Sequence, residues 1–335
     1  MNRRLVTVWL LVVLGLVAFP SRSPAPLVYR PGEGWTYEPV GGEGKWRRAR
    51  AKEQLEVAQT AFDKKDYGLA LRAARRVTGV WPLSDYAPQA QYLVGRCYEA
   101  RGQSEKAFKE YQRLLEKHPK IAGFQEVLHR QYEIANLYLA GKWFRLWGYI
   151  PLPPSAAKTA QMYEKIVKSG PYSDVAPEAQ LKLGAAHVKQ KDFPAAAKDF
   201  EVAADRYHDR PKIAAEALFQ EGQAYNREAL RAGYDQSTAG QAIAAFNDFM
   251  TLYPDEPRVS KATNSIALLK KEQALGCFQI AEFYEKAKFY SKAARWKGAR
   301  TYYNEVVLLD PTSEYANLAR KRIDALNKLL REASK

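Results

Sequence analysis

Residues 95–119, GRCYEARGQSEKAFKEYQRLLEKHP, contain two amphipathic helices separated by a turn. The first helix carries a small residue and then an aromatic one. The second carries a small residue, an aromatic four positions later and an aliphatic three further on, and a proline ends it. These positions are Gly95 and Tyr98, then Ala107, Tyr111 and Leu114, then Pro119. Because small residues let helices approach closely and proline cannot continue a helix, the stretch predicts a helical hairpin.

The same pattern recurs from about Arg50 onward with a period in the thirties. One hairpin cannot bury its apolar face alone, so neighbouring hairpins must stack. The sequence therefore predicts an all-α, right-handed solenoid of about six hairpins with a C-terminal capping helix. The predicted units cover 50–82, 83–119, 124–171, 172–208, 211–254 and 262–311, and the cap covers 313–333.

The N-terminal residues have the features of an export signal. Arg3 and Arg4 precede Leu5–Phe19, which carries no charge. Fifteen residues are fewer than the roughly 20 that a membrane span needs, whereas Pro24 and Pro26 make a poor cleavage site. Residues 1–25 are therefore predicted to be a signal peptide, with an uncleaved signal anchor as the alternative.

Residues 26–49 are rich in proline and glycine and carry Tyr29, Trp35 and Tyr37 without a period. They predict an extended tether between the signal and the folded body.

The composition limits the classes of partner. The chain has 335 residues, of which 47% are hydrophobic, and a formal net charge of +15. Such a charge suits nucleic acid, anionic lipid or acidic protein surfaces, or it is simply a solvated basic surface. Lys45–Lys52 is the one dense basic run. An exported protein rarely meets nucleic acid and no base-stacking motif is present, so no nucleic-acid partner is predicted.

Residues able to carry catalysis are sparse. The two cysteines, Cys97 and Cys277, form no CxxC motif and are expected to be buried thiols, with a disulfide or a modified thiol as the alternative. None of the four histidines pairs with another at a metal-ligand spacing, and His187 is expected to replace a packed aromatic residue. No phosphate loop or nucleophile motif is present. We therefore predict no enzyme activity, no catalytic residues, no metal, no cofactor and no small-molecule substrate.

A phrase that follows the unit-closing prolines carries a family resemblance. It consists of serine, an acid, tyrosine or valine, and then two alanines three apart, and we expect its serine to cap the next helix. It occurs as Ser84–Ala90, Ser173–Ala179 and Ser313–Ala319. The units resemble tetratricopeptide repeats. The phrase, together with Ile280–Leu326, resembles the BamD/ComL/YfiO family of outer-membrane assembly proteins.

This resemblance implies a periplasmic or outer-membrane-associated scaffold. Its protein partners would be a barrel-assembly subunit or unfolded β-barrel clients, and membrane-surface contact is possible. The family is lipid-anchored through a cysteine directly after the signal, and this sequence has none there. The alternative is a periplasmic repeat protein of a cell-division, peptidoglycan or polysaccharide-export complex.

Departures from the repeat mark the candidate partner-binding residues. The third unit carries an aromatic and proline-rich insertion over 142–154, and the sixth lengthens around Lys286–Lys297. Insertions in solenoids project from one edge and often bind partners, although this one could instead fold back over the groove between hairpins. Leu230–Gly240 in the fifth unit is expected to be a flexible turn. The candidate residues are Trp143, Phe144, Trp147, Tyr149, Ile150, Tyr290 and Trp296.

Overall fold

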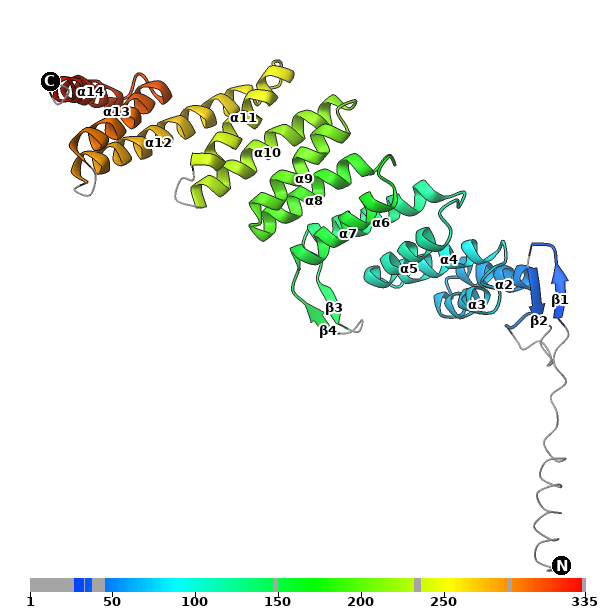
Figure 1. Ribbon diagram of the computed structural model, residues 1–335. Coiled ribbons are helices and arrows are strands. Elements are labelled where there is room, and N and C mark those ends of the chain that lie inside the picture. Colours follow the sequence, from blue (N-terminus) through cyan, green and yellow to red (C-terminus); the bar gives the residue numbers. More distant parts are fainter. Residues whose placement is uncertain are drawn as a thin grey trace, which may run out of the picture. The chain divides into compact units, whose positions relative to one another are not determined.

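Helices dominate the described part of the chain (Figure 1). The computed structural model describes residues 27–32, 34–37, 46–146, 150–231, 236–287 and 291–332. The predicted signal over 1–25 and residues 38–45 of the predicted tether lie outside the described residues. The chain divides into two compact units, Met1–Ala122 and Gly123–Lys335.

In the first unit a two-stranded β-hairpin precedes four helices, each of which packs against the next. The elements are β1 (Leu27–Arg30), β2 (Gly34–Tyr37), α2 (Ala51–Asp63), α3 (Tyr67–Val80), α4 (Ala87–Ala100) and α5 (Ser104–Lys117).

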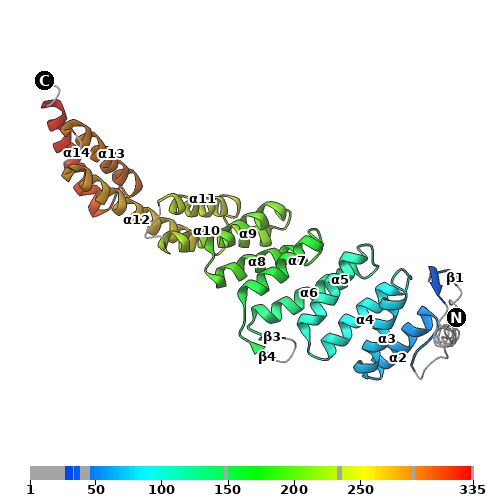
Figure 2. The same cartoon turned by 60° about the horizontal axis from the view of Figure 1, so that its bottom comes forward.

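In the second unit nine described helices and a second β-hairpin follow in order, again with neighbouring helices in contact (Figure 2). The all-α prediction of stacked helical hairpins is confirmed. The elements are α6 (Phe124–Leu139), β3 (Phe144–Leu146), β4 (Ile150–Leu152), α7 (Ala156–Ser169), α8 (Ala176–Gln190), α9 (Phe193–Arg206), α10 (Pro211–Arg231), α11 (Gln236–Leu252), α12 (Val259–Lys286), α13 (Lys292–Leu309) and α14 (Glu314–Glu332).

The repeating small and aromatic residues are the packing contacts between paired helices. A Cβ atom at Gly95 would lie 2.3 Å from the ring of Tyr111, and one at Gly184 would lie 2.7 Å from the ring of Phe200. Both separations are far below van der Waals contact. A larger residue at either glycine would therefore force the two helices of its hairpin apart.

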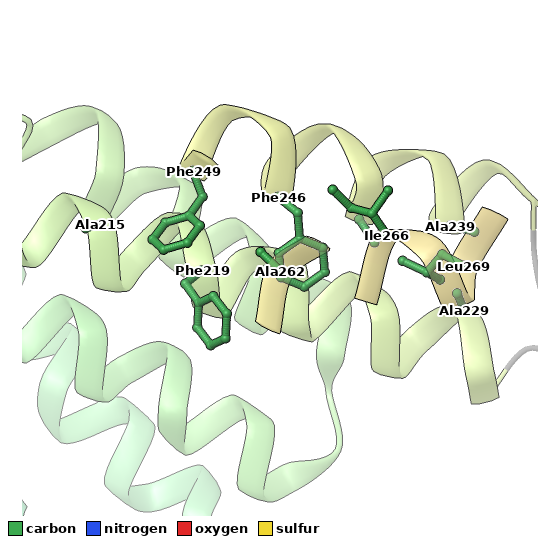
Figure 3. Close-up of a cluster of buried hydrophobic side chains, with 10 residues drawn as sticks. Ala215, Phe219, Ala229, Ala239, Phe246, Phe249, Ala262, Ile266 and Leu269 are labelled. Carbon is green, nitrogen blue, oxygen red and sulfur yellow. The ribbon is translucent and has the colours of Figure 1, made fainter. Parts of the chain in front are cut away.

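Figure 3 shows the aromatic core of α10–α12, which the same pattern builds. Phe219 lies between Phe246 and Phe249, at ring-centroid distances of 5.9 and 5.4 Å. Ala262, Ile266 and Leu269 of α12 close this cluster. The 28-residue helix α12 also packs on α13 further along, so one helix contributes to two successive layers.

Two of the three predicted serine caps are wrong. Helix α4 begins after Tyr86 and α8 begins after Val175, so Ser84 and Ser173 lie two residues too early to cap them. Pro88 and Pro177 explain the difference, because in a longer helix each proline ring would clash with the serine carbonyl four residues before it. Asparagine replaces the proline in α14. There Ser313 Oγ accepts a hydrogen bond from Ala316 N at 3.1 Å, as predicted.

The thiol prediction is confirmed and the tether prediction is refined. Cys97 and Cys277 are free and buried. Leu27–Tyr37, within the segment expected to be extended, forms the antiparallel hairpin β1–β2. Its turn is possible because Gly32 and Gly34 adopt φ angles of 79° and 72°, which glycine reaches at little cost. Among the described helices, none has the length and apolar character of a membrane span.

Candidate partner-binding surfaces

The insertion of the third unit forms the hairpin β3–β4, which leaves the repeat stack between α6 and α7 (Figures 1 and 2). Its strands pair antiparallel, with Phe144 opposite Leu152 and Arg145 opposite Pro151. Gly141, at φ 109°, turns the chain out of α6. Ser155 returns it to α7 by accepting a hydrogen bond from Lys158 N at 3.3 Å. The insertion is thus an ordered ribbon at its base.

Phe144 anchors this ribbon to the body of its unit. Its side chain is only 2% exposed, and its ring stacks on Tyr138 of α6 with centroids 4.2 Å apart. The ammonium of Lys158, from the first turn of α7, lies 5.0 Å from the Phe144 ring centroid, which adds a cation–π contact. Of the candidate binding residues, Phe144 therefore supports the hairpin from within and offers no surface.

The neighbouring candidates do face solvent. Trp143 is 56% exposed and Ile150 is 49% exposed, and Pro151 beside them is exposed as well. Trp147 and Tyr149, at the predicted tip, lie outside the described residues. Trp143 and Ile150 are thus two large apolar side chains that stay exposed while Phe144, next to Trp143, is buried.

Basic side chains also lie in and near this hairpin. Arg145 and Lys158 are exposed, and burial together with the nearby Arg145 lowers the pKa of Lys142. Lys189 of α8 donates from Nζ to the carbonyl of Leu139 at 2.6 Å, which ties the end of α6 to the next hairpin. A cation at a helix C-terminus also compensates the partial negative charge there.

A hollow lies at the same end of α6, between α6 and α8. It has a volume of about 400 Å³ and is lined by Tyr132, Asn136, Leu139, Ala140, Glu178 and Lys182. Tyr132 donates from its hydroxyl to Glu178 Oε2 at 2.9 Å, and burial together with this bond raises the pKa of Tyr132 to about 12. The sequence analysis missed this site because its two sides are 46 residues apart.

The candidate residues of the sixth unit separate into two cases. Tyr290 lies outside the described residues. Trp296, on α13, is partly buried and packs against the core that Ala281, Ala299 and Tyr303 form. Most of its contact is therefore with the fold itself.

His187 does more than fill space. Its Nδ1 lies 2.5 Å from Asp199 Oδ2, so it is a hydrogen-bonded partner of a carboxylate and not only a packed ring. Gln180 donates to the same carboxylate and to the Asp199 carbonyl. Burial raises the pKa of Asp199. Within the described ranges, no cluster of His, Cys, Asp and Glu side chains could hold a metal ion.

Sequence comparison assigns the repeats. Residues 154–308 match the family YfiO, described as an outer membrane lipoprotein, and residues 89–120 match a tetratricopeptide-repeat family. The chain is a tetratricopeptide-repeat protein that is BamD/YfiO-like over residues 154–308. The YfiO match begins two residues after β4, so the β3–β4 hairpin precedes the part of the chain that is BamD/YfiO-like.

Solved tetratricopeptide-repeat proteins resemble the chain at low identity. The C-terminal part of one from Cytophaga hutchinsonii is 15% identical, over 81% of this chain and 87% of that one, with a TM-score of 0.34. One from Parabacteroides merdae is 14% identical, over 85% and 99%, with a TM-score of 0.33. No curated protein matches the chain.

Proposed function

We propose that this protein is a non-catalytic scaffold of the cell envelope whose partners belong to outer-membrane β-barrel assembly. The tetratricopeptide repeats support a role in protein–protein interaction, and the match to a family described as an outer membrane lipoprotein supports the envelope. A barrel-assembly subunit or an unfolded barrel client is the partner that the family resemblance suggests.

The β3–β4 hairpin is the observation that carries the binding role. Exposed aromatic side chains on a rigid support are the usual energetic centre of a protein interface. Trp143 meets this description, because Phe144 beside it is locked against Tyr138 and Lys158. A partner therefore does not have to order the base of the ribbon when it binds, which lowers the entropic cost of association.

The surroundings of the hairpin define the chemistry of the partner. Trp143 and Ile150 would contact apolar residues of the partner, and the exposed Arg145 and Lys158 would meet acidic residues on it. Pro151 lacks a backbone N–H, so the strand that contains it is poorly suited to pairing with a further strand. Binding through side chains is thus favoured over strand addition along β4.

The test is photo-crosslinking in living cells from position 143 of the full-length chain. The matched control carries the same crosslinker at Tyr172, which is 86% exposed in the turn after α7. Position 143, and not position 172, is expected to capture a barrel-assembly subunit or an unfolded barrel protein.

Two outcomes would contradict the proposal. Equal capture from positions 143 and 172 would show that the hairpin has no specific partner. Specific capture of peptidoglycan-linked or secretion proteins would favour the alternative, a periplasmic repeat protein of a cell-division, peptidoglycan or polysaccharide-export complex.

A further inference from the structure

The hairpin β1–β2 presents an aromatic pair to solvent. Tyr29 and Trp35 are directly opposite in the strand register, so their side chains lie on the same face of the ribbon. Their ring centroids are 5.3 Å apart, yet the residues remain 59% and 67% exposed. The pair gains little burial from this contact, and most of its apolar surface stays available to a partner.

The pair is held in place by the backbone of the first unit. Asp85 N, in the turn before α4, donates to the carbonyl of Gly32 at 2.7 Å. A Cβ atom at Gly32 would lie 3.3 Å from Asp85 Oδ2, so this turn approaches the loop as closely as a residue without a side chain allows. Figures 1 and 2 both show the ribbon beside the first helices of its unit.

Basic residues lie in the same unit at the start of α2. Arg47 and Arg50 are exposed, and Arg50 is the residue that precedes the first turn of the helix. The guanidinium groups of Arg47 and Arg72 both lie within 6 Å of the Trp46 ring centroid, at 5.4 and 5.8 Å. Glu53 offsets part of the Arg50 charge through an exposed ion pair of 3.7 Å.

The sequence places an apolar run close to this hairpin. Leu5–Phe19 is separated from β1 by only Pro20–Pro26. Eight Cα-to-Cα steps, fully extended, span at most about 28 Å, which is about the thickness of one hydrocarbon core. In the alternative of an uncleaved signal anchor, the apolar run is held in a bilayer and β1 cannot move far from that bilayer's surface.

We propose that the Tyr29–Trp35 face of β1–β2 rests in the headgroup region of an anionic bilayer. Tyrosine and tryptophan favour this region, where the ring is apolar and its polar tip stays hydrated. Arg47 and Arg50 add attraction to anionic lipid phosphates. The contact is independent of the proposed function, because a scaffold can bind its protein partners without touching lipid.

The test uses the full-length chain with a nitroxide at position 35, attached through Trp35→Cys. The native thiols of Cys97 and Cys277 are 0% and 1% exposed, so the added thiol is the reactive one. A nitroxide at Tyr172→Cys is the matched control, since Tyr172 is also an exposed aromatic residue. Both chains are reconstituted with vesicles of phosphatidylcholine and phosphatidylglycerol, and the accessibility of each label to oxygen and to a water-soluble nickel chelate is measured.

The label at 35 is expected to gain oxygen accessibility and to lose nickel accessibility, whereas the label at 172 does not change. Because the label replaces one ring of the pair, quenching by brominated lipid is measured in addition on the unlabelled chain and on Trp35→Phe. Trp35→Phe should lose part of the quenching. If position 35 stays as open to nickel as position 172, and Trp35→Phe is quenched like the wild type, the face points to water or to a protein and the proposal fails.

A charge variant tests the lipid preference separately. Arg47→Glu combined with Arg50→Glu should lower the ratio of bilayer-bound to water-exposed label at position 35 about tenfold on vesicles with phosphatidylglycerol. The ratio on phosphatidylcholine alone should barely change. Equal ratios for both chains on the anionic vesicles would contradict the proposed role of the anionic headgroups.

Discussion

The two β-hairpins of this chain are attached to its helices in opposite ways. The β3–β4 hairpin is held by a side chain, because Phe144 is buried on Tyr138 while Trp143 and Ile150 stay outside. The β1–β2 hairpin shows no such anchor among its described side chains. Its Tyr29 and Trp35 are both exposed, and a backbone hydrogen bond from Asp85 to Gly32 fixes its turn.

The comparison shows two ways in which a helical repeat protein can hold a β-hairpin that exposes aromatic side chains. Where an apolar side chain anchors the ribbon, its stability depends on hydrophobic burial. Among the described contacts of β1–β2, the conformation of Gly32 and its hydrogen bond with Asp85 N contribute to stability. The first ribbon should therefore be sensitive to truncation of a side chain, and the second to addition of one.

The largest expected effect is the loss of the Phe144 anchor. Phe144→Ala removes a buried ring and should cost about 3 kcal/mol, mostly as local opening of β3–β4. Hydrogen exchange over 144–152 should accelerate by about two orders of magnitude, while α8 and α9 keep their protection. Trp143→Ala is the matched control and should leave exchange unchanged. Slow exchange in Phe144→Ala would show that β3 and β4 stay paired without the Phe144 side chain.

Glu221 offers a contrast to the two hairpins, because here the burial of a charged group, and not the anchoring of a ribbon, affects the stability of the fold. Burial, followed by repulsion from Glu201, Asp205 and Asp248, raises its pKa from 4.5 to about 7. The folded state therefore favours the protonated acid. Its contribution to stability is complete below pH 4.5 and is lost as the pH rises to about 7.

Glu221→Gln should accordingly stabilise the protein by about 1–2 kcal/mol well above pH 7, after allowance for solvent screening. Below pH 4.5 it should have little effect. Denaturant unfolding at both extremes measures the difference, and Glu56→Gln, at an exposed position of α2, is the control because Glu56 is not among the charges that act on Glu221. Equal gains at both extremes would show that the Glu221 charge is not the cause.

The backbone-anchored hairpin should respond to Gly32→Ala. The new Cβ atom meets Asp85 Oδ2 at 3.3 Å and the residue must keep a φ of +79°, so the hairpin should weaken by about 1–1.5 kcal/mol. Gly34→Ala is the matched control, because φ is +72° there but nothing lies within 4 Å of the added Cβ. It should cost less. Tryptophan emission and hydrogen exchange over 27–37 report the result, and equal losses would contradict the close approach to Asp85.

The smallest effect on stability should come from Trp143→Ala combined with Ile150→Ala. Both side chains are about half exposed, so the free energy of unfolding should change by less than about 0.5 kcal/mol. Crosslinking from Arg145 of the same hairpin should nevertheless weaken at least tenfold. Truncation of a residue at the centre of an interface lowers the binding free energy far more than truncation of an exposed residue lowers fold stability. Unchanged crosslinking would place the partner contact elsewhere.

The repeat register could be read from the sequence because it rests on local pairs. Gly95 and Tyr111 are 16 residues apart, and the close contact of their helices leaves only a small residue opposite a large one. The serine caps were less predictable. Ser84 and Ser313 sit in the same phrase, and the proline four residues after Ser84 decides where its helix begins.

The two β-hairpins and the hollow between α6 and α8 could not be predicted from the sequence for a different reason. Phe144 and Trp143 are adjacent and both aromatic, so no pattern tells which is the anchor and which is exposed. Composition likewise suggested a tether at Tyr29 and Trp35, because hairpins of four residues a strand leave little periodicity to detect.

By itself, then, the sequence determined the all-α repeat, its small-and-aromatic packing, the buried thiols and the position of the insertion in the third unit. These properties follow from side-chain volumes at fixed helical spacings, which any neighbouring hairpin must accommodate. Only the tertiary structure decided which aromatic residues are buried and which face outward, that His187 binds Asp199, and that Tyr132 meets Glu178. The Tyr132–Glu178 contact joins helices that are distant along the chain, and the other outcomes depend on which neighbouring side chains pack around each residue, which no short sequence pattern specifies.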